Sequence, residues 1–219
     1  MPGSSGEKSI VAVGPRGLEG ILRVPRKSIG LVVFAHGAGS SRLSPRNNFV
    51  AEQLEKKGIA TLLFDLLTEA EAADRNNVFD IPLLSERMIE AVGWVRGEPE
   101  LSDLPIGLFG SSTGAAAALV AAARAPEDVD VVVSRGGRPD LAGDVLPQVQ
   151  APTLLIVGAW DNIVIELNEA AAAALRCEHR LEIVPGATHL FEEPGTLDQV
   201  VSQAGDWFET HFLAVRKMQ

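Results

Sequence analysis

A Gly-x-Ser-x-Gly pattern is the part of this sequence most able to carry chemistry. Residues 110–114 read GSSTG, between an apolar run at 106–109 and an alanine-rich run at 115–123. The first run is typical of a buried strand and the second of a helix. A serine at the centre of such a strand–turn–helix sits on a strained turn that exposes its oxygen, and the flanking glycines avoid collisions there. We therefore expect Ser112 to attack an acyl carbonyl.

This interpretation needs a base, because the pattern alone arises by chance in about one chain in ten of this size. A serine hydroxyl becomes nucleophilic when a histidine takes its proton. Of the four histidines, His189 follows the last expected strand, where that base belongs. His179 precedes the same strand, and His211 lies in the terminal helix, where a surface role is expected. His36 ends the first parallel strand and is better placed to shape an oxyanion loop.

An acid must hold the histidine in one tautomer and offset its developing charge. Asp161 directly follows the preceding strand in VGAWD and is the expected acid. Its alternative role is a helix N-cap, since a helix begins a few residues later. The fallback acids, none of them at a strand's carboxyl end, are Asp140, Asp144 and Glu166.

The tetrahedral intermediate needs two N–H donors directed at its oxyanion. One is expected from Thr113, which follows the nucleophile at the start of a helix. The other is expected from Ala38, in the small-residue loop HGAGS at 36–40. His36 and Gly37 of this loop are then candidates for contact with substrate. The alternative is that the loop is only a flexible Gly/Ser turn.

Two arginines follow another strand near the expected site. Arg135 and Arg138 could clamp an anionic substrate, since a guanidinium matches a carboxylate or phosphate. The alternative, which we favour from the sequence, is internal pairing with Asp140 or Asp144.

The elements that must position these residues follow a regular alternation. Segments 9–13 and 18–24 flank GPRG and indicate a hairpin. After it, apolar segments alternate with helical ones, and residues 66–80 form a charged, irregular excursion. The expected strands are 29–35, 59–64, 106–109, 129–134, 153–157 and 180–184, and the expected helices are 45–57 (capped by Ser44-Pro45), 82–96 (capped by Asp80), 115–124, 166–175 and 196–212.

This alternation predicts an α/β fold with a mostly parallel, doubly wound sheet and an N-terminal antiparallel hairpin. Ligands bind beyond the carboxyl ends of the strands in such sheets. Only 18 residues, 135–152, separate two of the strands, so no large cap domain fits there. We expect an open, shallow site, lined partly by residues 66–80, that prefers short acyl chains.

Composition narrows the remaining possibilities. The chain of 219 residues is expected to form a single domain, 1–219. A net charge of −10 argues against nucleic acid or a membrane surface as partner. The single cysteine, Cys177, and an N-terminus without an apolar signal-peptide core favour a cytoplasmic protein. No motif indicates a metal or other cofactor, and we expect a monomer or small homo-oligomer acting on a small-molecule ester.

The motifs HGAG, GSSTG, GAWD and GATHLF, in this order and spacing, resemble the α/β-hydrolases of the dienelactone hydrolase group. TLLFDLLTEAEAADRNNVFDIPLL, VVSRGGRPDLAG and VIELN are similar to small bacterial hydrolases of that group. In that branch the hydrolase domain is sometimes fused to a phosphoribosyltransferase domain. The resemblance implies an α/β-hydrolase fold and a Ser-Asp-His triad at Ser112, Asp161 and His189.

The chain also departs from that family. Dienelactone hydrolases proper use a cysteine at the elbow, engaged by a glutamate from the loop after the first parallel strand. Here the elbow holds Ser112, the loop reads HGAG, and Cys177 lies far away in the sequence. We therefore expect a carboxylesterase-type serine hydrolase acting on ordinary small esters. The alternatives are a thioesterase, peptidase or perhydrolase with the same triad, or a non-catalytic binding or regulatory module.

Overall fold

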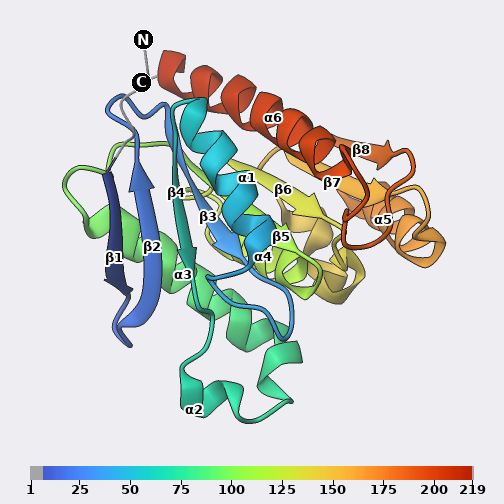
Figure 1. Ribbon diagram of the computed structural model, residues 1–219, viewed down its shortest axis with the longest axis horizontal. Coiled ribbons are helices and arrows are strands. Elements are labelled where there is room, and N and C mark those ends of the chain that lie inside the picture. Colours follow the sequence, from blue (N-terminus) through green and yellow to red (C-terminus); the bar gives the residue numbers. More distant parts are fainter. Residues whose placement is uncertain (1–6, 219) are drawn as a thin grey trace.

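A computed structural model describes residues 7–218 of the chain, which form one eight-stranded sheet flanked by helices (Figure 1). The segment MPGSSG, on which the expected lack of a signal peptide partly depends, lies outside the described residues. The strands are β1 Glu7–Val13, β2 Leu18–Val24, β3 Gly30–Ala35, β4 Ile59–Phe64, β5 Ile106–Ser111, β6 Val131–Arg135, β7 Thr153–Gly158 and β8 His179–Val184. The helices are α1 Pro45–Lys56, α2 Glu69–Ala72, α3 Ile81–Gly97, α4 Thr113–Arg124, α5 Asn162–Ala174 and α6 Thr196–Met218, with 3-10 segments η1 Asn77–Phe79 and η2 Pro139–Gln148.

The sheet has the order β1-β2-β4-β3-β5-β6-β7-β8. β1 pairs with β2, and β2 with β4, in antiparallel register, and every other neighbouring pair is parallel. β3, β4, β5, β6 and β7 are buried along their whole length. This burial on both faces is why these strands are continuously apolar in the sequence. The predicted fold and its antiparallel hairpin are confirmed.

The two faces of the sheet carry separate cores. α1 and α6 cover one face (Figure 1). On this face Phe34 and Phe109 pack with ring centroids 4.8 Å apart, in one cluster with Phe208 and Phe212. α3, α4 and α5 cover the other face. The alanines of α4 at 115–118, 121 and 122 are completely buried there, because small side chains let a helix approach the sheet closely.

The helix starts behave as the sequence indicates. The side chain of Ser44 accepts a hydrogen bond from Asn47 N at the start of α1, and that of Asp80 accepts one from Leu83 N at the start of α3. The expected surface role of His211 is wrong: the residue is 9% exposed and its ring packs edge-on against Trp207. It lies one turn after Trp207, on the face of α6 that meets the sheet.

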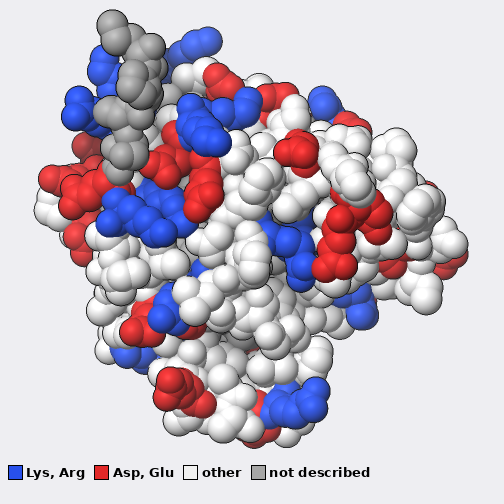
Figure 2. All heavy atoms as spheres, viewed as in Figure 1, with Lys and Arg blue, Asp and Glu red and all other residues white. Residues whose placement is uncertain are grey.

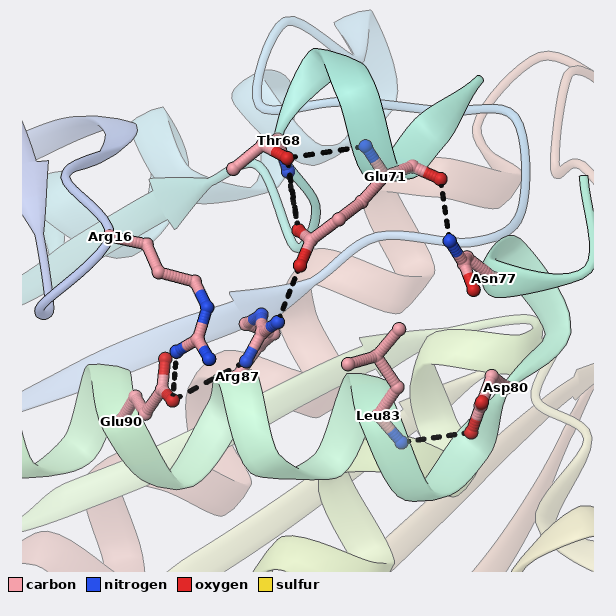
Figure 3. A network of polar contacts seen from close by, with 8 residues as sticks. All are labelled: Arg16, Thr68, Glu71, Asn77, Asp80, Leu83, Arg87 and Glu90. Atoms are coloured by element: carbon pink, nitrogen blue, oxygen red, sulfur yellow. Dashed lines mark hydrogen bonds and ion pairs between the residues drawn. The ribbon is translucent and has the colours of Figure 1, made fainter. Parts of the chain in front are cut away.

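The excursion at 66–80 is ordered rather than irregular (Figure 3). Thr68 and Glu71 form a reciprocal capping box at the start of α2. Glu71 also receives a hydrogen bond of 2.7 Å from Arg87, a side chain of α3 that is almost completely buried. Arg87 in turn contacts Glu90, which Arg16 of the β1–β2 turn also reaches. A short helix far from the sheet is thereby fixed to α3 and to the hairpin.

The connection between β6 and β7 contains only η2. Within the described residues, no large cap domain covers the carboxyl ends of the strands, as predicted from the length of this segment. On the face that carries α1 and α6, basic and acidic side chains are interspersed (Figure 2). Among residues 7–218, no helix is both long and apolar enough to cross a lipid bilayer.

A tight steric constraint on the fold lies at Gly110, where the nearest atoms are backbone, and it yields a test. A methyl group there would lie 2.4 Å from Ala115 Cα. We expect Gly110→Ala to lower the free energy of unfolding by about 2–3 kcal/mol or more, because backbone and not a flexible side chain must move. The control is Gly93→Ala in α3, where nothing lies within 4 Å. It should raise stability by about 0.5–1 kcal/mol. Urea unfolding measures both, and equal effects would contradict the account.

Candidate active site

Ser112 occupies a sharp turn between β5 and α4. Its φ of 52° lies in the left-handed region that side chains rarely adopt. A methyl group at Gly114 would lie 2.3 Å from Ala35 O, so β3 passes directly against the start of α4. Gly110 and Gly114 thus let β5, α4 and β3 approach each other closely enough to impose this turn. Such strain at a single residue persists only when its surroundings fix it.

The backbone of Ser112 is fixed by hydrogen bonds on both sides. Its N–H donates to Arg135 O at 3.3 Å, and its carbonyl accepts from Ala115 N at 3.1 Å and Arg138 N at 3.0 Å. Ser112 holds the N-cap position of α4, yet its side chain makes no capping hydrogen bond. The hydroxyl is therefore not used to begin the helix and lines a surface hollow instead.

His189 and Asp161 meet beyond the ends of β8 and β7. Nδ1 of His189 lies 2.6 Å from Oδ2 of Asp161, a short hydrogen bond in which the ring donates to the carboxylate. Asp161 stands at the N-cap position of α5 but makes no side-chain capping bond, so its carboxylate serves the histidine. Its side chain is 17% exposed, while that of His189 is 38% exposed.

Backbone contacts hold the two loops together. Trp160 N donates to Ala187 O at 3.0 Å, which joins the segment before Asp161 to the segment before His189. A methyl group at Gly158 would lie 2.4 Å from the same carbonyl. The glycine therefore permits the close approach that brings Asp161 and His189 into contact.

A hollow of about 230 Å³ contains the side chains of Ser112 and His189. Gly37, Ala38 and Ser40 of the 36–40 loop form one wall. The same three residues also border a second, larger hollow of about 320 Å³. Its other residues come mainly from the excursion and the start of α3, with apolar side chains of Leu66, Leu67, Ala72, Val78 and Leu84.

The expected oxyanion donors lie side by side but are not both free. Thr113 begins α4 and is 6% exposed, so its N–H belongs to the unpaired first turn of a helix. The N–H of Ala38 donates to the hydroxyl of Thr113 at 2.9 Å. Gly37 lies against Ser112, since a methyl group there would be 3.0 Å from Ser112 Cβ.

His36 connects the 36–40 loop to the excursion. Its Nε2 accepts a hydrogen bond from Leu66 N at 3.1 Å, and its Nδ1 donates to Gly37 O at 3.0 Å. Burial lowers the pKa of His36, against opposing effects from Gly37 O and Asp65. The ring is therefore neutral and structural, which agrees with its expected role in shaping the loop.

The two arginines after β6 have different surroundings. Arg138 makes a two-pronged bond to Asp140, at 2.8 Å for each contact, so internal pairing is confirmed for this residue. The same expectation is wrong for Arg135, whose Nη2 donates to Asn47 Oδ1 at 3.2 Å. Arg135 borders the hollow with Ser112, whereas Arg138 does not.

Sequence reasoning missed the contribution of α1. Arg46 lines the hollow beside Ser112, and Asn47 supports Arg135 from behind. One signal was available for Asn47, because it precedes Val50, Ala51 and Leu54 at the spacing of the buried face of α1. A polar residue on that face requires a buried partner. Among the described residues, no cluster of three His, Cys, Asp or Glu could hold a metal ion.

Residues 28–207 match the sequence family described as "Alpha/beta hydrolase domain". The chain belongs to this family. It is 50% identical to a dienelactone hydrolase from Anabaena variabilis, whose crystal structure superposes with a TM-score of 0.92 over 95% of this chain and 99% of that one. This protein is therefore a dienelactone hydrolase-like α/β-hydrolase. Est1E from Butyrivibrio proteoclasticus shares the fold, with a TM-score of 0.78 at 16% identity over 96% of this chain and 100% of its own.

A curated relative from Mycobacterium tuberculosis is named "Putative phosphoribosyl transferase". It is 58% identical over 205 residues, which cover 94% of this chain and 46% of the relative. The chain thus spans about half the length of that relative. The region shared by the two proteins is the one that matches the α/β-hydrolase family.

The neutral state of His36 predicts a dependence of stability on pH. Its folded-state pKa lies below the ordinary value, so the unfolded chain binds more protons as the pH falls below about 6.5. The contribution of His36 to the free energy of unfolding is therefore fully present above that pH and is lost as the pH falls below it. His211, whose pKa is also lowered by burial, acts in the same direction. Urea unfolding at pH 7.5 and 5.5 should show that His36→Gln reduces the loss seen in the parent. An unchanged difference in the variant would contradict this assignment.

Proposed function

We propose that the protein is a serine hydrolase that cleaves small carboxylic esters through an acyl-enzyme intermediate. One observation carries this proposal. His189, whose ring lies 2.6 Å from Asp161, lines the same hollow as Ser112, and the Ser112 hydroxyl makes no capping bond to α4. A side chain that merely began a helix would be bonded to that helix. Nucleophile, base and acid instead follow three different strands and converge at one edge of the sheet.

The chemistry follows from these positions. Ser112 Oγ attacks the acyl carbon while His189 Nε2 takes its proton. Asp161 keeps the other ring proton on Nδ1 and offsets the charge of the imidazolium. The imidazolium then gives its proton to the leaving alcohol, and the acyl group remains on Ser112. Water attacks the acyl-enzyme by the same route, which releases the acid and restores the serine.

The oxyanion of each tetrahedral intermediate is assigned to the N–H groups of Thr113 and Ala38. The helix N-terminus favours negative charge at Thr113 N. Ala38 N bonds to the Thr113 hydroxyl in the free protein, so it must turn from that oxygen to the oxyanion during reaction. Between turnovers the hydroxyl holds the 36–40 loop beside the nucleophile. Thr113 is thus both an oxyanion donor and, through its side chain, a positioning residue.

The larger hollow, which lies between the 36–40 loop and the excursion, supports a preference for short acyl groups. Its apolar residues bound only about 320 Å³, and no cap domain extends it. The Anabaena relative is named a dienelactone hydrolase, and a lactone is a cyclic ester that the same steps would open. We assign phosphoribosyl transfer to none of the described residues, because the curated relative so named is about twice as long as this chain.

The primary test is turnover of p-nitrophenyl esters from acetate to laurate. We expect acetate or butyrate to be the best substrate and Ser112→Ala to lower kcat by about 10⁴-fold or more. Ser102→Ala, at a half-buried serine whose hydroxyl bonds to Pro99 O and Asp103, is the control and should match the parent. A preference for twelve carbons would contradict the substrate proposal. A folded but inert parent protein would instead favour a binding module.

The Thr113 hydroxyl provides a second test. Thr113→Val keeps the shape and the oxyanion N–H but removes the oxygen that holds Ala38 N. We expect kcat to fall by about 10- to 100-fold with little change in KM, since the loss acts on the oxyanion. Thr113→Ser restores the hydroxyl and should recover most of the activity. If the serine variant is as impaired as the valine variant, the hydroxyl does not act as assigned.

A further inference from the structure

The hollow beside Ser112 carries two guanidinium groups and no carboxylate. Arg135 enters it from the end of β6 and Arg46 from α1. Its other polar side chains are the serines at 40, 44, 111 and 112 and the imidazole of His189. A small hollow of about 230 Å³ with this lining has a net positive charge, in a chain whose net charge is −10.

Arg135 is buried without a counter-charge. It is 6% exposed, and among the described residues no carboxylate forms an ion pair with it. One Nη donates to the neutral amide of Asn47, and the guanidinium lies 5.9 Å from the ring centre of Phe191. Its Nε is buried with no hydrogen-bond partner. Buried charges in proteins are ordinarily paired, so the guanidinium of Arg135 can still donate hydrogen bonds to an anion.

Polar contacts behind Arg135 hold its guanidinium in place. Asn47 Nδ2 donates to Ser111 Oγ at 3.4 Å, and Ser111 Oγ donates to Ala35 O at 3.4 Å. This chain of polar contacts joins α1, β5 and β3 behind the arginine. Burial and the charge of Arg46 lower the pKa of Arg135 to about 10, so the group is still a cation at neutral pH.

Arg46, which already lines the hollow, can give up its present partner at little cost. Its side chain is 35% exposed and forms an ion pair of 2.9 Å with Glu192, which is 62% exposed. Ion pairs between exposed side chains are weak, because water screens both charges. Arg46 can therefore exchange Glu192 for an anion in the hollow.

We propose that this hollow binds an anionic oxygen group of the substrate cleaved by Ser112, and that it prefers the dianion of a phosphate monoester. The inference rests on the proposed function, because the anion and the scissile ester belong to one molecule. Arg135 supplies a buried guanidinium, Arg46 supplies the second cation, and Ser44 supplies a hydroxyl at the start of α1.

A phosphate fits this arrangement better than a carboxylate does. Its three acceptor oxygens and charge of about −2 suit two guanidiniums that enter from different elements. A carboxylate is planar and is satisfied by one two-pronged guanidinium, which leaves the second cation without a partner. The opposing interpretation is that Arg135 only supports Asn47. A measurement of anion binding distinguishes the two interpretations.

The test is calorimetric titration of Ser112→Ala, which cannot turn over ester, with phenyl phosphate, benzoate and benzamide at constant ionic strength. We expect phenyl phosphate to bind at least about fivefold more tightly than benzoate, and benzamide to bind more weakly than either. Adding Arg135→Gln or Arg46→Gln should weaken phenyl phosphate binding by about tenfold or more. Arg138→Gln is the matched control, because its partner is Asp140 and it lies outside the hollow.

Three results would overturn the inference. Benzoate binding as tightly as phenyl phosphate would contradict the preference for a dianion. Equal binding of benzamide, or unchanged binding in Arg46→Gln, would contradict an anion site. Arg46 is partly exposed, so that variant is informative even if Arg135→Gln fails to fold.

The two proposals fail separately. Ester turnover by the parent without phenyl phosphate binding by Ser112→Ala overturns the anion site alone. Phenyl phosphate binding without any turnover of neutral or anionic esters overturns the hydrolase proposal and leaves an anion-binding module.

Discussion

The left-handed backbone at Ser112 is the constraint on which the rest of the site depends. It exists because β5, α4 and β3 approach each other at Gly110 and Gly114 more closely than any side chain would allow. The same contact ends the strand, begins the helix and leaves the serine oxygen unused by either. Hydrogen bonds from Arg138 and to Arg135 then connect this turn to the end of β6.

The parallel strands of the sheet bring Asp161 and His189 to the same edge as Ser112. β5, β6, β7 and β8 are consecutive neighbours, so residues that follow them meet at one edge. Asp161 and His189 come into contact because the backbone at Gly158 passes directly against Ala187. α1, which follows β3, adds Arg46 and Asn47 from the other side. The site is thus a product of strand ends, with no inserted domain.

Much of this could be predicted from the sequence, because Ser112 and Asp161 closely follow apolar strands and His189 lies in the loop after the last strand. The parallel sheet followed from the alternation of apolar strands with helices, and the missing cap followed from the length of the segment at 135–152. The partner of Arg135 could not be predicted, since Asn47 lies 88 residues away and only packing brings the two together. The contact of Ala38 N with the Thr113 hydroxyl depends likewise on the exact path of a loop. The surface role expected for His211 was wrong although a signal was present, because its spacing of four residues from Trp207 places it on the apolar face of α6.

The central claim is that Ser112, and no neighbouring serine, is the activated nucleophile. Its most direct test is reaction of the native protein with a fluorophosphonate, followed by mass spectrometry of the peptide that contains Ser111 and Ser112. The account predicts one phosphonyl group on Ser112, with labelling strongly slowed in His189→Ala. An adduct on Ser111, or a folded protein that does not react, would contradict it.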